Sequence, residues 1–241
     1  MATYVHSKRA AVIHGDKNLQ DWMREASASI QNENADTSHF GHDAKTYIVG
    51  QNDAQFTGSG LYDGTIDGVE QHMEAILEDE LANENPLPIT FAPEGLVFGG
   101  AALMANAKHT TYEVNQVISD VVSWSFEMQA DGGMHGGSIL FPPTPINTAT
   151  TVNGASEDGL ASSAHGAVLN AHVLANTTGN NVVVKLQHST NDSTWVDLAT
   201  ATLEEGAEVV VATGTVNRYL RIIVTTTGSG SVTVVGAAAR K

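Results

Sequence analysis

Histidine and acidic side chains are the residues of this sequence that could do chemistry. His39 and His42 have the HxxH spacing of metal ligands, and His14, His109 and His135 lie elsewhere in the chain. A zinc site needs three or four convergent ligands with supporting hydrogen bonds. Neither an HExxH motif nor a cysteine accompanies the pair. We therefore interpret these histidines as surface or loop residues and expect no metal site.

A turn near residue 63 partly matches a calcium-binding loop. Positions 1, 5, 6 and 12 of an EF-hand loop are matched by Asp63, Asp67, Gly68 and Glu74. Thr65 is a poor ligand for position 3, however. The apolar spacing of a helix also begins inside this loop, at Ile66. A turn followed by a helix is therefore the favoured interpretation.

No catalytic constellation stands out. Asp120 and Glu127 could pair for glycoside hydrolysis, but a spacing of seven puts them on opposite faces of a strand. GxSxG, a Walker P-loop and a GxGxxG leading into a helix are all absent from the sequence. We expect no enzyme and no cofactor. Trp195 leaves carbohydrate binding open as an alternative, although a lone Trp after a turn is more typical of the core or edge of a β-sandwich.

The charge of the chain limits its partners. There are 11 Lys and Arg residues against 27 Asp and Glu, which gives a net charge of −16. Nucleic-acid binding needs clustered basic residues, so tight DNA binding is not expected, whereas an acidic wall would let DNA pass without adhering. The sequence has no cysteine, no apolar signal segment and no apolar run of the roughly 20 residues that cross a membrane.

Strand patterns dominate the chain around one helix. In the first part, residues 45–62 read as two strands around a turn at 50–53. Apolar residues from Ile66 to Leu81 recur every three or four positions, which predicts an amphipathic helix with Thr65 as its N-cap. A long strand is predicted over 118–129, with Trp124, Phe126 and Met128 on one face and Ser125, Glu127 and Gln129 on the other. The glycine-rich segment 131–138 is predicted to be a mobile loop.

A proline-rich segment divides the chain. Pro142, Pro143 and Pro145 remove backbone donors, and 20 of the 27 acidic residues precede them. We predict a first domain at 1–141, a linker at 142–147 and a second domain at 148–241. Apolar residues alternate over 182–188 and 219–225 and again from Val232, as in short antiparallel strands. The expected fold class is mainly β: an N-terminal barrel or sandwich with one flanking helix, and a C-terminal antiparallel β-sandwich.

The second domain also resembles a known family. The segments DGLASSAHGAVLNAHVL (158–174), VKLQHSTNDSTWVDL (184–198) and NRYLRIIVTTTGSGSVTVVGAAAR (217–240) are similar to the outer β-sandwich of the major tail tube proteins of siphophages, which have long non-contractile tails. The first domain resembles the tube-forming part by the order of its elements, with GLYDGTIDGVE leading into a helix and then a long amphipathic strand.

The resemblance implies a structural virion protein made in the host cytoplasm. Its first domain would form stacked, hexameric rings whose acidic lumen passes viral DNA, and the second would decorate the outside. Residues near the N-terminus and around 31–42 would contact the next ring. The implied partners are other copies of the chain, a tape measure protein, and terminator and baseplate or tip proteins at the ends. A head decoration or connector protein, or a carbohydrate-binding adhesin-like module, remains the alternative.

Overall fold

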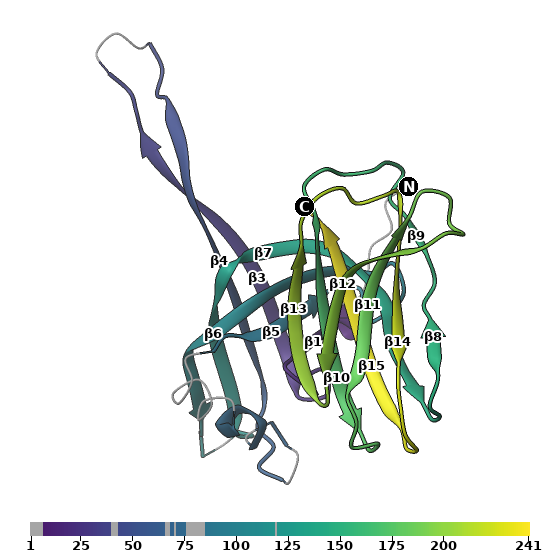
Figure 1. Ribbon diagram of the computed structural model, residues 1–241. Helices are drawn as coiled ribbons and strands as arrows, with labels where there is room; N and C mark the ends of the chain where they lie inside the picture. Colours follow the sequence, from purple (N-terminus) through teal and green to yellow (C-terminus); the bar gives the residue numbers. More distant parts are fainter. Residues whose placement is uncertain (1–6, 40–42, 66–67, 70, 76–84, 119) are drawn as a thin grey trace.

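The protein folds as antiparallel β-strands in two sheets (Figure 1). The computed structural model describes residues 7–39, 43–65, 68–69, 71–75, 85–118 and 120–241. The strands of the N-terminal part are β1 (Ala11–His14), β2 (Lys17–Asn18), β3 (Met23–Asp36), β4 (Tyr47–Leu61), β5 (Leu87–Ala92), β6 (Ala101–Asn115) and β7 (Ser123–Ile146). Those that follow are β8 (Thr151–Asn153), β9 (Glu157–Asp158), β10 (Ala167–Asn176), β11 (Val182–Ser189), β12 (Val196–Leu203), β13 (Gly206–Ala212), β14 (Tyr219–Thr225) and β15 (Val232–Arg240). A 3-10 turn, η1, spans Ser7–Arg9. The prediction of a mainly β fold is confirmed.

The larger sheet runs through both halves of the chain. Its strand order is β13-β10-β15-β7-β6-β5-β1-β2, and β3 joins it through β4, which pairs with β7. The smaller sheet has the order β12-β11-β14-β8, with β9 also on β14, and packs against β10, β13 and β15 to form the C-terminal sandwich. The alternating segments of the second half form β11, β14 and β15, as predicted.

Buried apolar side chains of the described residues form three clusters. One gathers around Trp124, Phe126 and Met128, and another fills the sandwich from Leu140 onward. A third joins the two halves, since it packs Ala92, Ala102 and Met104 with Ala237 and Ala239 of β15. The domain boundary near residue 141 remains our proposal.

Strand β7 carries the sheet from one half into the other. Its first part pairs with β4 and β6, and its last part pairs with β15. Between the Asn106–Asp131 and Met104–His135 pairs, β7 has two more residues than β6. Gly132 and Gly133 absorb this bulge at φ angles of 86° and 85°, which glycine adopts without strain. The prediction of a loop over 131–138 was therefore wrong.

The proline-rich segment also lies mostly within β7. Residues up to Ile146 pair with β15, with Pro145 opposite Thr233, so the expected semi-rigid linker at 142–147 is a strand as far as Ile146. Proline is tolerated here for two reasons. The pairing of β7 with β6 ends at Ser138, so later residues have a strand neighbour on one side, and a register shift interrupts the β15 pairing after Phe141.

The start of β7 lies later than the sequence predicted. The residues before Ser123 form a turn. In this turn the Asp120 amide donates to the Val117 carbonyl, and the Asp120 carboxylate accepts a hydrogen bond from the Val121 amide. Ile118 is fully exposed. The alternation is confirmed from Trp124 to Met128, since Trp124, Phe126 and Met128 are buried.

The structure differs in detail from two other predictions for the N-terminal part. Residues 47–61 form the single strand β4 and not two strands around a turn. Of the predicted helix, residues 69 and 71–75 are helical, with Val69 and Met73 buried, while Ile66 and the segment 76–84 lie outside the described residues. Thr65 does not act as predicted: its hydroxyl donates to the Asp63 carboxylate, which also accepts from the Thr65 amide.

Candidate functional site

The candidate ligand sites taken from the sequence do not come together. His39 is exposed near the tip of the long hairpin, and His42 lies outside the described residues. Within the described ranges, no group of three His, Cys, Asp or Glu side chains could hold a metal ion. The Asp63 carboxylate accepts hydrogen bonds from the Thr65 hydroxyl and, at 3.0 Å, from the indole N–H of Trp22. These bonds lower the pKa of the Asp63 carboxyl group. This segment is a turn that precedes a helix.

Asp120 and Glu127 are not a carboxylate pair. Asp120 lies in the turn before β7, while Glu127 lies on β7 and accepts a hydrogen bond from Gln55 of β4.

Trp195 lies on the surface of the sandwich and not in its core. Its ring lies under the guanidinium of Arg221, 4.2 Å from the ring centroid. The Arg221 Nε donates to Gln187, and Gln187 donates to Asp197, which Lys185 also contacts at 2.6 Å. These polar groups bond to one another across β11, β12 and β14.

A polar face extends across β3, β4, β7 and β6. Residues directly opposite one another in paired strands point to the same side of the sheet. The rows on the polar side are Glu25–Ser59–Ser125–Glu113, Ser27–Thr57–Glu127–Thr111 and Ser29–Gln55–Gln129–Lys108. The rows on the other side are Ala26–Gly58–Phe126–Tyr112 and Ala28–Phe56–Met128–His109, and they pack onto the core. One side of this sheet is therefore apolar and covered, and the other is polar.

The polar face carries an acidic excess. Its three rows contain the carboxylates of Glu25, Glu113 and Glu127 and one cation, Lys108. A groove of about 500 Å³ runs along it between Glu25, Glu113 and Glu127. The remaining side chains of the rows are short or uncharged, so the surface offers little for an anion to bind.

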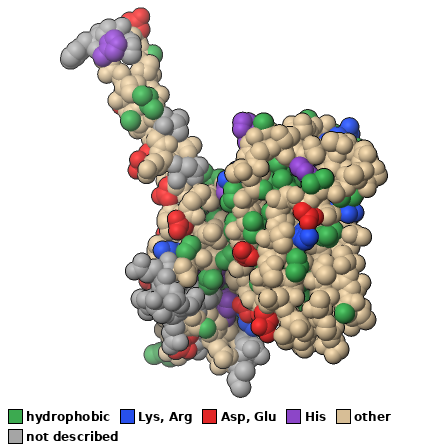
Figure 2. Space-filling model, viewed as in Figure 1, with side chains coloured by type: hydrophobic (Ala, Val, Ile, Leu, Met, Phe, Trp, Pro, Cys, Tyr) green, Lys and Arg blue, Asp and Glu red, His purple; other side chains and the backbone are tan. Residues whose placement is uncertain are grey.

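The hairpin β3–β4 extends beyond the body as an arm, which we define as residues 30–53 (Figures 1 and 2). Strand β7 supports β4 as far as Gln55, but the β3–β4 pairing continues to Asp36 and Tyr47. From Ile30 to Asp36 this two-stranded ribbon spans roughly 20 Å at about 3.3 Å per residue. The described side chains of the arm are exposed and include Ile30, Tyr47 and Ile48.

The sheet behind the polar face has two unpaired edges among the described strands. Strand β3 pairs with β4 on one side, and no described strand lies on its other side. On the far side, β5 pairs with β6 as far as Ala107, while β6 continues along β7 to Asn115. No described strand therefore pairs with residues 108–115 on their outer edge.

Sequence reasoning missed a group of buried histidines. His14, predicted to be a surface or loop residue, is completely buried, and its ring contacts those of His72 and His109. Its place at the end of the apolar run AVIH was the available signal.

Comparisons with known proteins give distant likenesses. No protein-family model and no curated protein matches the sequence. Among solved structures, a chain in the virion of a native gene transfer agent particle is 14% identical, with a TM-score of 0.43 over 56% of this chain and 100% of that chain. A chain of the sheath–tube complex of an extracellular contractile injection system is 14% identical, with a TM-score of 0.44 over 56% and 92%. The Dit protein of SPP1 is 12% identical, with a TM-score of 0.37 over 96% and 99%. At these values none of them assigns a function to this chain.

Proposed function

We propose that this protein is a structural subunit of a phage tail tube, in which copies form hexameric rings that stack around a lumen for DNA. The observation that carries the proposal is the four-stranded sheet with one polar, acidic face and an unpaired edge on each side. The sequence resemblance of the second half to siphophage major tail tube proteins supports the same function.

The unpaired edges favour ring closure. Exposed strand edges bind other strands and aggregate unless they are covered. The β3 edge and the edge at 108–115 of β6 are different surfaces of one subunit, so pairing between them is heterologous and repeats around an axis. A closed ring leaves no edge open, and it makes the rows on β3, β4, β7 and β6 into a continuous barrel wall.

The polar side of that wall would face the lumen. The opposite side carries Trp124, Phe126 and Met128, which are buried in the apolar core, so it is already covered within the subunit. Carboxylates on the inner wall repel the phosphates of DNA, and the short Ser and Thr side chains offer them few donors. Such a wall lets DNA and a tape measure protein move without adhering.

The arm would join one ring to the next. A two-stranded ribbon is marginally stable alone in water, and this one exposes Ile30, Tyr47 and Ile48. Contact with a copy in the neighbouring ring would bury these side chains. The C-terminal sandwich would lie on the outside, and terminator and tip proteins would close the two ends of the tube.

Electron microscopy of the purified protein at high concentration tests this proposal. We expect rings or tubes with a central hole, and we expect single rings from a variant in which residues 32–52, between the paired Gln31 and Asp53, are replaced by Asn-Gly, the residues of a tight hairpin turn. Monomers of the intact protein in the presence of tail-tip proteins would contradict the proposal. Globular particles without a central hole would contradict it as well.

A further inference from the structure

Four histidines from four elements meet inside the N-terminal part, next to the sandwich. They are His14 of β1, His72 of the helix formed by residues 69 and 71–75, His109 of β6 and His172 of β10. The ring centroids of His14 and His109 are 5.0 Å apart, and those of His14 and His72 are 5.8 Å apart, both edge to face. His14 is thus enclosed by other imidazoles.

The four histidines differ in how many of their ring nitrogens form hydrogen bonds. Both ring nitrogens of His172 have a partner, because Nε2 lies 2.8 Å from the Thr90 hydroxyl and Nδ1 lies 2.7 Å from the Gly15 carbonyl. Neither ring nitrogen of His14 has a hydrogen-bond partner among the described residues, and the same is true of Nε2 of His72. Burying such groups unpaired destabilises a fold. An apolar ring at position 14 would avoid this cost, so the imidazole is not explained by packing.

The charged groups near the cluster do not favour a proton at its centre. His14 faces His109, His72 and His172, and burial together with these neighbours holds its pKa well below the usual value. At His72, burial and Lys17 lower the pKa to about 3. A hydrogen bond with the His14 backbone opposes this decrease in the pKa, and His109 adds to it. The Asp16 carboxylate lies 3.8 Å from Nδ1 of His72. Both rings are therefore neutral at pH 7.

We propose that this histidine cluster is a proton-operated latch that holds the helical residues 71–75 against β1 and β6 and releases them in mild acid. His72 is the movable member, because it comes from the helix and lies at the edge of the cluster next to Asp16. When the helix moves away, His72 reaches water and takes up a proton, and His14 loses the ring that covers it.

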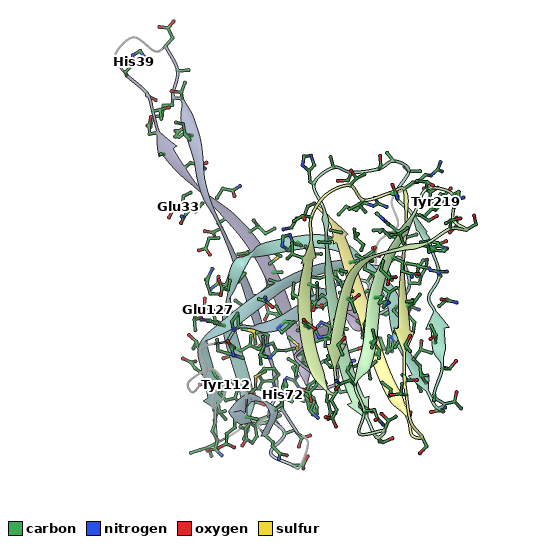
Figure 3. All side chains as sticks on the ribbon, viewed as in Figure 1. Glu33, His39, His72, Tyr112, Glu127 and Tyr219 are labelled. Carbon is green, nitrogen blue, oxygen red and sulfur yellow. The ribbon has the colours of Figure 1, made fainter. Side chains whose placement is uncertain are left out.

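The helix lies at the opposite end of the molecule from the arm, as the positions of His72 and His39 show (Figure 3). If the proposed stacking of rings holds, this end faces the neighbouring ring. Acid release of the helix would then loosen the stack. This last step rests on the proposed function, whereas the opening of the helix does not.

Hydrogen–deuterium exchange of the unassembled full chain at pH 7.5 and pH 5.0 tests the latch. Exchange rates are first corrected for the effect of pH on intrinsic amide exchange. We then expect the protection of amides 71–75 to be at least tenfold lower at pH 5.0 than at pH 7.5. The reason is that protonation of one imidazole with the usual pKa of 6.5 favours the open state by about thirtyfold at pH 5.0. Strands β11 and β14 should change less than twofold. Equal protection of the helix at the two pH values would overturn the proposal.

Three variants assign the effect to the cluster. His72→Phe keeps a ring that cannot titrate and should reduce the pH effect on the helix to below threefold, whereas His14→Phe leaves the His72 imidazole in place and should still show a loss of protection of at least tenfold. His165→Gln changes an exposed histidine of the sandwich and should retain the full effect. A pH effect that persists in His72→Phe would overturn the latch. If His72→Phe does not fold, the wild-type pH profile decides: a loss of protection that begins near pH 6.5 and deepens as the pH falls supports histidine, and a loss that appears only near pH 4 identifies carboxylates and overturns the latch.

Two further readouts separate the parts of the proposal. Thermal stabilisation by added Zn²⁺ at pH 7.5 that is lost in His14→Phe would identify a metal site and overturn the latch. Microscopy of assembled tubes at pH 5.0 tests the consequence for stacking. Tubes that stay intact while the helix loses protection would overturn the link to stacking, but neither the latch nor the tube function.

Discussion

The hydroxyl of Thr90 on β5 lies 2.8 Å from Nε2 of His172 on β10, although the two residues are 82 positions apart in the sequence. Asn170, which also lies on β10, donates to the Thr90 hydroxyl at 2.9 Å and to the Ile89 carbonyl at 3.2 Å. All of these groups are buried. The C-terminal sandwich is therefore joined to the N-terminal sheet by a specific polar contact as well as by the shared strand β7.

Removal of the Asn170 side chain should weaken this junction. Asn170→Ala leaves the Ile89 carbonyl and the Thr90 hydroxyl without a buried donor, so we expect the free energy of unfolding to fall by about 1–3 kcal/mol. Urea denaturation of the unassembled protein measures it. The matched change Thr215→Ala, at an exposed position, should stay within about 0.5 kcal/mol. Equal effects of the two changes would show that the contact contributes nothing.

The buried His172 predicts that the protein loses stability in acid. Burial lowers its folded-state pKa to about 4, against 6.5 for the free side chain. Below pH 6.5 the unfolded chain binds a proton that the folded chain does not, so stability is complete above pH 6.5 and falls as the pH drops toward 4. The slope from this one residue is about 1.4 kcal/mol per pH unit.

Urea denaturation of the unassembled protein between pH 7 and pH 4.5 measures that loss, and His172→Gln should reduce the slope by this amount. An unchanged slope in a folded His172→Gln protein would refute the assignment.

Charge reversal on the polar face should slow the passage of DNA. Glu127→Lys places a cation in the middle row, where it can bind phosphate. We expect slower DNA ejection from particles with normal tails, and an effect that weakens as salt rises. Glu205→Lys, on the exposed surface of the sandwich, is the matched control. Identical ejection by the two variants would place Glu127 away from the lumen.

Changes in the arm should separate assembly from folding. Ile48 is 63% exposed in the isolated subunit, so Ile48→Ser should change the free energy of unfolding by no more than about 0.5 kcal/mol. Because the proposed contact between rings buries this side chain, tube length measured by microscopy should fall sharply. Leu160→Ser, which changes an exposed residue of the sandwich, should leave tube length unchanged. Full-length tubes from Ile48→Ser would exclude Ile48 from the contact.

Strands with one buried face could be predicted from the sequence. In β11 and β14 every second residue enters the sandwich core, and Val184 and Ile222 illustrate the pattern. The same alternation identified which side of β7 is polar, and with it the row that contains Glu127.

The full length of β4 and β7 could not be predicted, because local turn signals compete with strand pairing. In β7, Gly132 and Gly133 form a bulge within a continuing strand. In the arm, the turn-like residues 50–53 lie where both faces of the ribbon meet solvent, so polarity there does not mark a loop.

The histidine cluster was missed for a different reason. Its members are separated by dozens of residues and meet through the packing of β1, β6, β10 and the helix. No local spacing encodes such a group.

Cryo-electron microscopy of assembled particles tests the central claim most directly, because it shows what lies beside β3. The account predicts that β3 of one copy runs next to residues 108–115 of β6 in the next copy, and that Glu127 faces a central channel. Particles in which the β3 edge meets solvent, or in which Glu127 faces outward, would contradict it.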